Sequence, residues 1–157
     1  MYIGVDPGKS GAIAIIDGFK SVPILDRIIE FGETERDVWK EYIDATDATI
    51  GGEHDCKALI EKVHSMPAQG VSSSFKFGMY YGQARMLLIA SGTPFETVRP
   101  LEWQRGLGIP KRGKDEAKTA FKRRLKAKAQ ELFPDVKITL KNADALLIAE
   151  YCRRITK

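Results

Sequence analysis

Short apolar segments at the start of the chain predict paired β-strands. YIGVD (residues 2–6) and GAIAIID (residues 11–17) are rich in apolar and β-branched residues and are joined by the turn sequence PGKSG. This arrangement is typical of a β-hairpin. SVPILDRIIEF (residues 21–31) predicts a third strand, and Pro23 favours a place near the sheet edge because proline has no backbone N–H for a central ladder.

Helical spacing alternates with further strands along the rest of the chain. In TERDVWKEYID (residues 34–44) the apolar residues fall on one side of a helix, and Thr34 is placed to cap its first turn. CKALIEKV (residues 56–63) predicts a buried strand, and PFETVRP (residues 94–100) predicts another that ends at Pro100. Further helices are predicted at residues 72–91, 101–108, 115–132 and 143–154.

The order of these elements predicts an α/β fold. The first three strands form an antiparallel meander, and the later strands alternate with helices as in βαβ units. A chain of 157 residues is long enough to bury a hydrophobic core without disulfides. We therefore expect one domain over residues 1–157.

Composition narrows the class of protein. Apolar residues make up 43% and charged residues 29% of the chain, as is usual for globular proteins that do not enter membranes. Cys56 and Cys152 form no CxxC or Cys/His pattern, so we expect reduced thiols and no zinc site. Asp6 and Lys9 interrupt the N-terminus before a signal-peptide core can form, and no apolar run approaches the ~20 residues of a membrane span. These features predict an intracellular protein.

A strongly basic segment lies in the second half of the chain. The net charge is only +4, but residues 111–130, KRGKDEAKTAFKRRLKAKAQ, contain nine basic and two acidic residues. Such a concentration of positive charge favours a polyanionic partner. The structural alternative is a basic helix face that is simply exposed to solvent.

Three carboxylates interrupt apolar elements in which packing alone does not require them. Asp6 ends the first strand, Glu61 lies within the strand at residues 56–63, and Asp144 lies in the first turn of the last helix. Each also has a structural explanation, respectively a turn acid, an ion pair with a neighbouring lysine, and an acid that favours the helix dipole. Together, however, they lie near the ends of elements that one sheet can bring together, and burying unpaired carboxylates is costly.

Converging carboxylates predict a metal site. They repel one another unless cations lie between them. Hard oxygen ligands with few histidines favour Mg²⁺, with Mn²⁺ able to substitute, over zinc. Two such ions about 4 Å apart are suited to in-line attack on a phosphodiester. The basic segment would then hold the phosphate backbone.

At these residues the chain resembles the RuvC-like Holliday junction resolvases of phage or organellar type, within the ribonuclease H-like superfamily. IGVDPGKSGAIAII is similar to the family's first hairpin, LIEKV to the strand that carries the second acid, GQAR (residues 82–85) to the following helix, and ADALLIAEY to the C-terminal helix. The resemblance covers nearly the whole chain. It implies a ribonuclease H-like fold, a five-stranded mixed sheet flanked by helices.

The resemblance also implies an activity. The chain would be a metal-dependent endodeoxyribonuclease that resolves four-way DNA junctions by paired symmetric nicks. Asp6, Glu61 and Asp144 would be its catalytic, metal-binding acids, with two Mg²⁺ ions per active site. It would act in the cytoplasm or nucleoid, or in the host cytoplasm if phage-encoded.

The same resemblance implies a homodimer, in keeping with the two-fold symmetry of a four-way junction. The helix at residues 72–91 is the candidate interface, because Ser74, Gly78 and Gly82 recur every four residues and allow a second backbone to approach closely. The alternative is close packing of this stripe on the chain's own sheet.

Two positions depart from the family pattern. Many relatives carry an acid or a histidine three residues before the last acid, where this chain has Lys141. A charged lysine does not ligate Mg²⁺. It either weakens the second metal site or contacts the scissile phosphate, unless Asn142 compensates. Bacterial relatives place an aromatic residue three positions after the second acid, where this chain has His64. An imidazole stacks on bases, so His64 is a candidate DNA contact or else a loop histidine without a special role.

The basic loop resembles the DNA-gripping lysines of the family. Lys111, Arg112, Lys114 and Lys118 are therefore predicted to bind DNA, and one of them to stabilise charge on the phosphate. Residues 122–124 (KRR) are predicted to be general backbone contacts or a solvated face.

Three other functions are compatible with parts of this pattern. One is a ribonuclease H-like nuclease that acts on other branched or hybrid substrates. Another is a non-catalytic junction-binding module, which Lys141 makes plausible. The third is a phosphate-binding fragment of the actin and sugar-kinase superfamily, which needs a second such domain that 157 residues do not supply.

Overall fold

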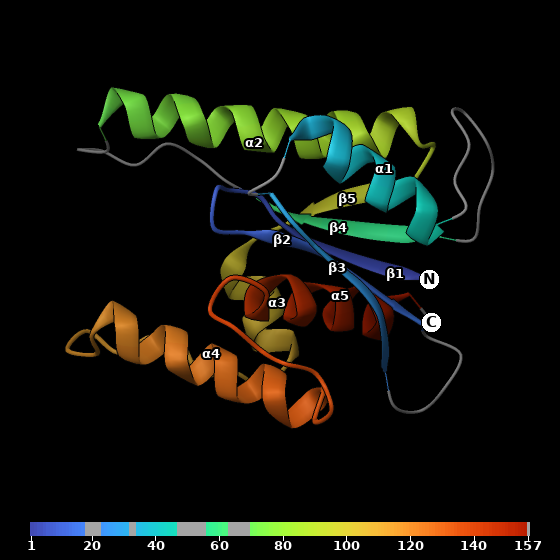
Figure 1. Ribbon diagram of the computed structural model, residues 1–157. Helices are drawn as coiled ribbons and strands as arrows, with labels where there is room; N and C mark the ends of the chain where they lie inside the picture. Colours follow the sequence, from blue (N-terminus) through green and yellow to red (C-terminus); the bar gives the residue numbers. More distant parts are fainter. Residues whose placement is uncertain (18–22, 32–33, 47–55, 63–69, 157) are drawn as a thin grey trace.

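The fold is a mixed sheet with helices on both faces (Figure 1). The computed structural model describes residues 1–17, 23–31, 34–46, 56–62 and 70–156. Helices α1 and α2 cover one face of the sheet, and α3, α4 and α5 lie on the other (Figure 1). None of the described helices is both long enough and apolar enough to cross a bilayer.

The sheet has five strands in the order β3-β2-β1-β4-β5. They are β1 Tyr2–Asp6, β2 Ala12–Asp17, β3 Ile24–Glu30, β4 Lys57–Glu61 and β5 Phe95–Val98. The first three strands pair antiparallel, whereas β1–β4 and β4–β5 pair parallel. The predicted meander and βαβ order are therefore confirmed. β3 is an edge strand, as the proline at position 23 predicted.

All the predicted helices are present, with ends displaced by a few residues. They are α1 Glu35–Thr46, α2 Val71–Ala90, α3 Pro100–Gly106, α4 Lys118–Leu132 and α5 Ala143–Ile155. Thr34 caps α1, since its Oγ1 accepts a hydrogen bond of 3.3 Å from the Asp37 backbone N–H. α4 begins three residues later than predicted. The residues before it form a turn, in which the Glu116 backbone N–H donates to the Gly113 carbonyl at 3.3 Å and Glu116 Oε2 accepts from the Gly113 backbone N–H at 3.2 Å.

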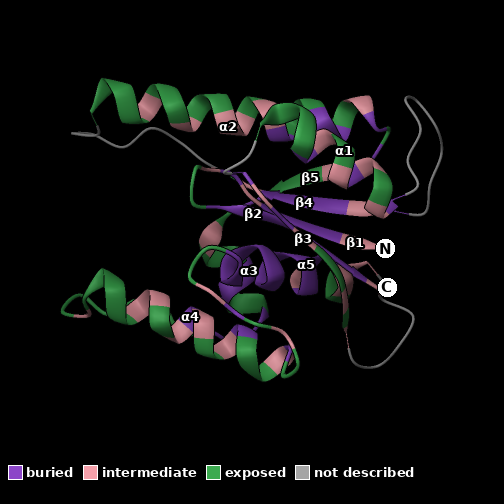
Figure 2. Cartoon of the chain, in the orientation of Figure 1, coloured by how far each residue is buried: buried purple, intermediate pink, exposed green. Residues whose placement is uncertain are grey.

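Helix α5 lies directly against the central strand. Most of its residues are buried (Figure 2). A Cβ atom added at Gly4 of β1 would lie 2.1 Å from the Ala145 carbonyl oxygen and 2.2 Å from the Ala149 backbone nitrogen. Glycine is therefore required at position 4 for this close approach. The contact brings the N-terminal turn of α5, which carries Asp144, to the sheet.

The small-residue stripe of α2 does not pack on the chain's own sheet, contrary to one of the two explanations considered for it. Cβ atoms added at Gly78 and Gly82 would meet nothing within 4 Å. The helix instead uses Ala84, Leu87 and Leu88 to face the sheet. The glycines of this stripe are therefore open to the surroundings.

Candidate metal and nucleic-acid site

The three predicted acids lie together near the carboxyl ends of the central strands. β1 and β4 are parallel and adjacent, and Val5 pairs with Ile60, so Asp6 and Glu61 lie side by side at the ends of these two strands. Asp144 lies in the first turn of α5, which packs on these strands. The charge of Asp144 raises the pKa of both Asp6 and Glu61, and the charge of Glu61 also raises that of Asp6, so the three carboxylates lie close together.

Asp6 is the acid most affected by this arrangement. Its pKa is raised well above the usual value, first by burial and then by the negative charges of Asp144 and Glu61, while Lys122 opposes the shift. A carboxylate in such surroundings is stabilised in its ionised form when a further cation is added.

Glu61 is held by a tryptophan from α3. The indole Nε1 of Trp103, which is fully buried, donates a hydrogen bond of 3.0 Å to Glu61 Oε1. Burial raises the pKa of Glu61 and the charge of Asp144 adds to the shift, whereas the Trp103 hydrogen bond opposes it. The tryptophan fixes one oxygen of the carboxylate and leaves the other available to a ligand.

Asp144 has one satisfied oxygen and one unsatisfied oxygen. Lys122 donates a hydrogen bond from Nζ to Oδ2. Oδ1 is buried and has no hydrogen-bond partner. Buried polar atoms are nearly always satisfied in native structures, so an orphaned carboxylate oxygen beside two other acids indicates a ligand site. Its chemistry, a hard anionic oxygen among carboxylates, suits Mg²⁺ or Mn²⁺.

Lys122 is not the general backbone contact or solvated residue that the sequence predicted. Burial acts to lower its pKa, but the charge and hydrogen bond of Asp144, together with Asp6 and Glu61, outweigh burial and raise it. The helical spacing contained the signal: Lys122 lies three residues before Leu125 and seven before Ala129, the two buried residues of α4. Lys122 thus projects from the inner side of a helix whose other side is basic and exposed.

Arg124 also departs from the sequence prediction. Its Nε and Nη2 atoms donate to the two carboxylate oxygens of Glu116, at 3.1 and 2.9 Å, and Nη1 donates to the Pro110 carbonyl at 2.9 Å. These bonds tie the basic loop to α4. Arg123, which lies between Lys122 and Arg124 in the sequence, is exposed.

A hollow of about 600 Å³ connects the acids to the basic segment. Its lining comprises Glu61, Pro100, Leu101, Gln104, Lys111, Arg112, Lys118, Phe121, Lys122, Leu125 and Asp144. The structure therefore brings two of the predicted acids and three of the predicted DNA-binding residues to one hollow. Lys114 is exposed in the same loop, and His64 lies outside the described residues.

Lys141 and Asn142 form contacts outside the acid cluster. Lys141 Nζ lies 2.9 Å from Oε2 of Glu30, the last residue of β3. The Asn142 amide is bonded within the loop before α5, where Oδ1 accepts from the Thr139 backbone N–H at 2.8 Å and Nδ2 donates to the Lys137 carbonyl at 3.2 Å. Across the described ranges, no three acidic, histidine or cysteine side chains surround a point closely enough to hold a metal ion as they stand.

Comparisons with known proteins show the fold. No protein-family model and no curated protein matches the sequence. Among solved structures, the chain is similar to Thermus thermophilus RuvC in complex with a Holliday junction substrate, with 14% identity, a TM-score of 0.59, and coverage of 98% of this chain and 94% of that one. It is also similar to a second Thermus thermophilus RuvC structure, with 15% identity, a TM-score of 0.57, and coverage of 98% and 95%. The predicted ribonuclease H-like fold class is thereby confirmed.

Proposed function

We propose that this chain is a metal-dependent endonuclease that cuts four-way DNA junctions by paired symmetric nicks. The observation that carries the proposal is the buried, unpartnered Oδ1 of Asp144, which lies beside two further acids at a hollow with a basic lining. The similarity to a RuvC structure in complex with a Holliday junction substrate favours this substrate over a simple duplex.

Asp6, Glu61 and Asp144 would hold the divalent ion. When bound, Mg²⁺ or Mn²⁺ would lower the pKa of an attacking water and stabilise charge on the phosphate oxygens. The chain's own contribution is to present carboxylate oxygens that protein contacts hold in place: Trp103 fixes Glu61, and Lys122 fixes Asp144.

The basic residues of the hollow would bind the DNA backbone. Lys111, Arg112 and Lys118 share the lining with Glu61 and Asp144, so a phosphate they attract is brought to the acids. Phosphate contacts of this kind supply affinity and salt dependence rather than sequence choice. Lys114, and His64 through stacking, would add further DNA contacts.

We also propose that two copies of the chain pair through α2. Phe75, Met79, Met86 and Ile89 are 70%, 46%, 58% and 55% exposed, which is unusual for large apolar side chains. Their spacing places them along one side of the helix together with Gly82, where a second backbone has room to approach.

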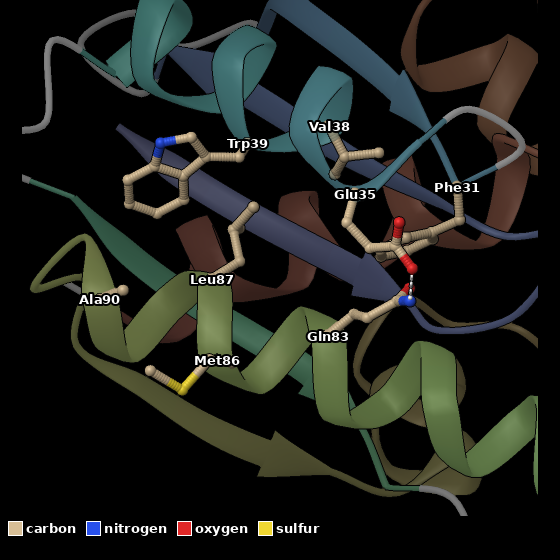
Figure 3. Close-up of a pocket in the computed structure, with 8 residues that line it drawn as sticks. All are labelled: Phe31, Glu35, Val38, Trp39, Gln83, Met86, Leu87 and Ala90. Carbon is tan, nitrogen blue, oxygen red and sulfur yellow. Dashed lines mark hydrogen bonds between the residues drawn. The ribbon is translucent and has the colours of Figure 1, made fainter.

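A hollow between α1 and α2 supplies the complementary surface for such a pair (Figure 3). It measures about 230 Å³ and is lined by Phe31, Glu35, Val38, Trp39, Gln83, Met86, Leu87 and Ala90. In an antiparallel pair of α2 helices that cross at Gly82, Phe75 of one copy lies opposite Ile89 of the other, because both are seven residues from the crossing. Phe75 then lies beside the partner's hollow, and Phe75→Asp is expected to convert a dimer to a monomer in analytical ultracentrifugation.

The proposed activity is tested with a labelled synthetic four-way junction and a matched linear duplex, each incubated with Mg²⁺, Mn²⁺ or EDTA. Paired symmetric nicks on the junction alone, absent in EDTA, are the expected result. Equal cutting of the linear or a hybrid duplex would contradict junction selectivity. Tight junction binding with no cleavage under any condition would instead show a non-catalytic binding module.

A further inference from the structure

We infer that the site binds one divalent ion per chain, not two, and that the Lys122 ammonium takes the place of a second ion. The inference rests on the proposed function, because it concerns the metal site of that nuclease. It follows from the hydrogen bonds that the carboxylate oxygens already accept, from the balance of charge in the cluster, and from the ion pair that Lys141 forms with Glu30.

Two carboxylate oxygens of the cluster already accept hydrogen bonds from the protein. Lys122 donates to Oδ2 of Asp144, and Trp103 donates to Oε1 of Glu61. A carboxylate oxygen that accepts a hydrogen bond can still bind a cation, but the positive charge of Lys122 opposes a metal ion at the same oxygen. With Lys122 in place, a single Mg²⁺ ion can take one oxygen from each acid and complete its shell with water or substrate. A second ion would have to share these oxygens with the first or displace Lys122 from Asp144.

The charges of the cluster also balance with one ion. Three ionised carboxylates are neutralised by one lysine ammonium and one divalent cation. A second divalent cation would leave two uncompensated positive charges beside Lys122 at a largely buried site, where like charges repel strongly. Lys122 lies on the inner side of α4 and is bonded to Asp144, so its positive charge is held within the site.

Lys141 forms an ion pair with a further acid on the row of Asp6. It precedes Asp144 by three residues, and its Nζ lies 2.9 Å from Oε2 of Glu30. Glu30 pairs across the sheet with Ala12, and Ala12 pairs with Asp6, so Glu30 lies on the same row as Asp6. The two acids are separated by two strand spacings, roughly 10 Å between their Cα atoms. Glu30, a further acid on the row of Asp6, is thus paired with a lysine.

The inference is tested by counting Mn²⁺ ions bound to the intact protein. The protein is stripped with EDTA, dialysed, and titrated with MnCl₂ while the free ion is measured by electron paramagnetic resonance. Sites that disappear in Asp144→Asn are counted as belonging to the cluster. We expect one such ion per wild-type chain. Two ions of comparable affinity would overturn the inference and leave the nuclease proposal standing, whereas no bound ion would refute the metal site on which both depend.

Substitution of Lys122 tests whether its ammonium takes the place of a second ion. Lys122→Met removes the ammonium and releases Oδ2 of Asp144, so we expect the count to rise to two and the first ion to bind roughly tenfold more tightly. Arg123→Met removes the same charge from the exposed neighbouring position and should leave one ion with unchanged affinity. A Lys122→Met protein that is folded by circular dichroism but binds like the wild type would overturn the part assigned to Lys122. If that variant does not fold, the wild-type count still decides between one ion and two.

Discussion

Helix α5 carries two buried acids, Asp144 in its first turn and Glu150 in its second half, and the hydrogen-bonding needs of the two are met very differently. Glu150, in the second half of the helix, is fully buried. It accepts hydrogen bonds from Nε of Arg153 and Nε of Arg154, each at 2.7 Å, and from Nη2 of Arg153 at 2.9 Å. Burial acts to raise its pKa, but the two arginines outweigh burial and lower it.

At the N-terminal end, Asp144 shares one oxygen with Lys122 and leaves the other without a partner. Under the proposed function, the difference is that between an acid that contributes to stability and an acid that binds a ligand. Glu150 takes its partners from the same helix, three and four residues away, and completes its hydrogen bonds without help. Asp144 lies beside two more carboxylates, and its unpartnered oxygen supports the proposed metal site.

The largest expected effect is the loss of cleavage when the N-terminal acid is changed. Asp144→Asn removes a proposed metal ligand and should lower the rate of junction cleavage roughly 10³-fold, which corresponds to about 4 kcal/mol of activation free energy. Glu150→Gln is the matched control on the same helix, and its cleavage rate per folded molecule should stay within about twofold of the wild type. Similar losses in both variants would contradict the distinction between the two acids.

The next largest effect is expected at the close contact between β1 and α5. Gly4→Ala introduces a methyl group where the Ala145 carbonyl oxygen and the Ala149 nitrogen already lie. We expect the free energy of unfolding, measured in urea, to fall by about 3 kcal/mol because α5 must move away from β1. Gly82→Ala, on the open side of α2, is the control and should not lower the stability of the monomer. Equal stability of the two variants would contradict the close packing of α5.

A smaller effect is expected from Glu150 itself. Glu150→Gln leaves Arg153 and Arg154 without their carboxylate, and the free energy of unfolding should fall by about 2 kcal/mol. This is below the full cost of breaking a buried ion pair, because Arg154 is 42% exposed and can be solvated by water. A change of less than about 0.5 kcal/mol in urea unfolding would show that Glu150 contributes little to stability.

The smallest expected effect is on the pH dependence of stability, to which Asp6 and Glu150 contribute with opposite signs. The pKa of Asp6 is raised in the folded chain, so folded molecules keep a proton that unfolded molecules release. The stability of the metal-free protein should therefore decline as the pH rises from the usual value of 3.8 through the raised pKa. Glu150, whose pKa is lowered, acts in the opposite direction: its contribution is present above its usual value of 4.5 and is lost as the pH falls through the lowered pKa.

Two substitutions separate these contributions. Asp6→Asn should stabilise the metal-free protein at neutral pH by about 1 kcal/mol and flatten the decline, since a neutral amide carries no charge to bury and does not repel Asp144 and Glu61. Glu150→Gln should flatten only the loss at acid pH. Thermal unfolding of both variants between about pH 3 and 8 provides the measurement, and an unchanged pH profile in Asp6→Asn would contradict the raised pKa of Asp6.

The sequence predicted the features of the fold and site that depend on neighbouring residues. The hairpin, the edge position of β3 and the three acids at the ends of apolar elements were all visible in short segments. The features that sequence reasoning missed join distant residues: Trp103 to Glu61 across 42 positions, Lys122 to Asp144 across 22, and Lys141 to Glu30 across 111. Such pairs depend on how the strands and helices are arranged, and a basic helix does not by itself reveal which of its lysines points inward.

Cleavage and binding of a four-way junction by Asp6→Asn test the central claim, that the acid cluster holds a metal ion for phosphodiester hydrolysis. Both are measured on the same labelled junction, cleavage in Mg²⁺ and binding by gel shift in EDTA. We predict that cleavage is abolished while the junction is bound as tightly as by the wild type, or more tightly, because a negative charge near the phosphate has been removed. Cleavage by Asp6→Asn at a rate close to that of the wild type would contradict the account.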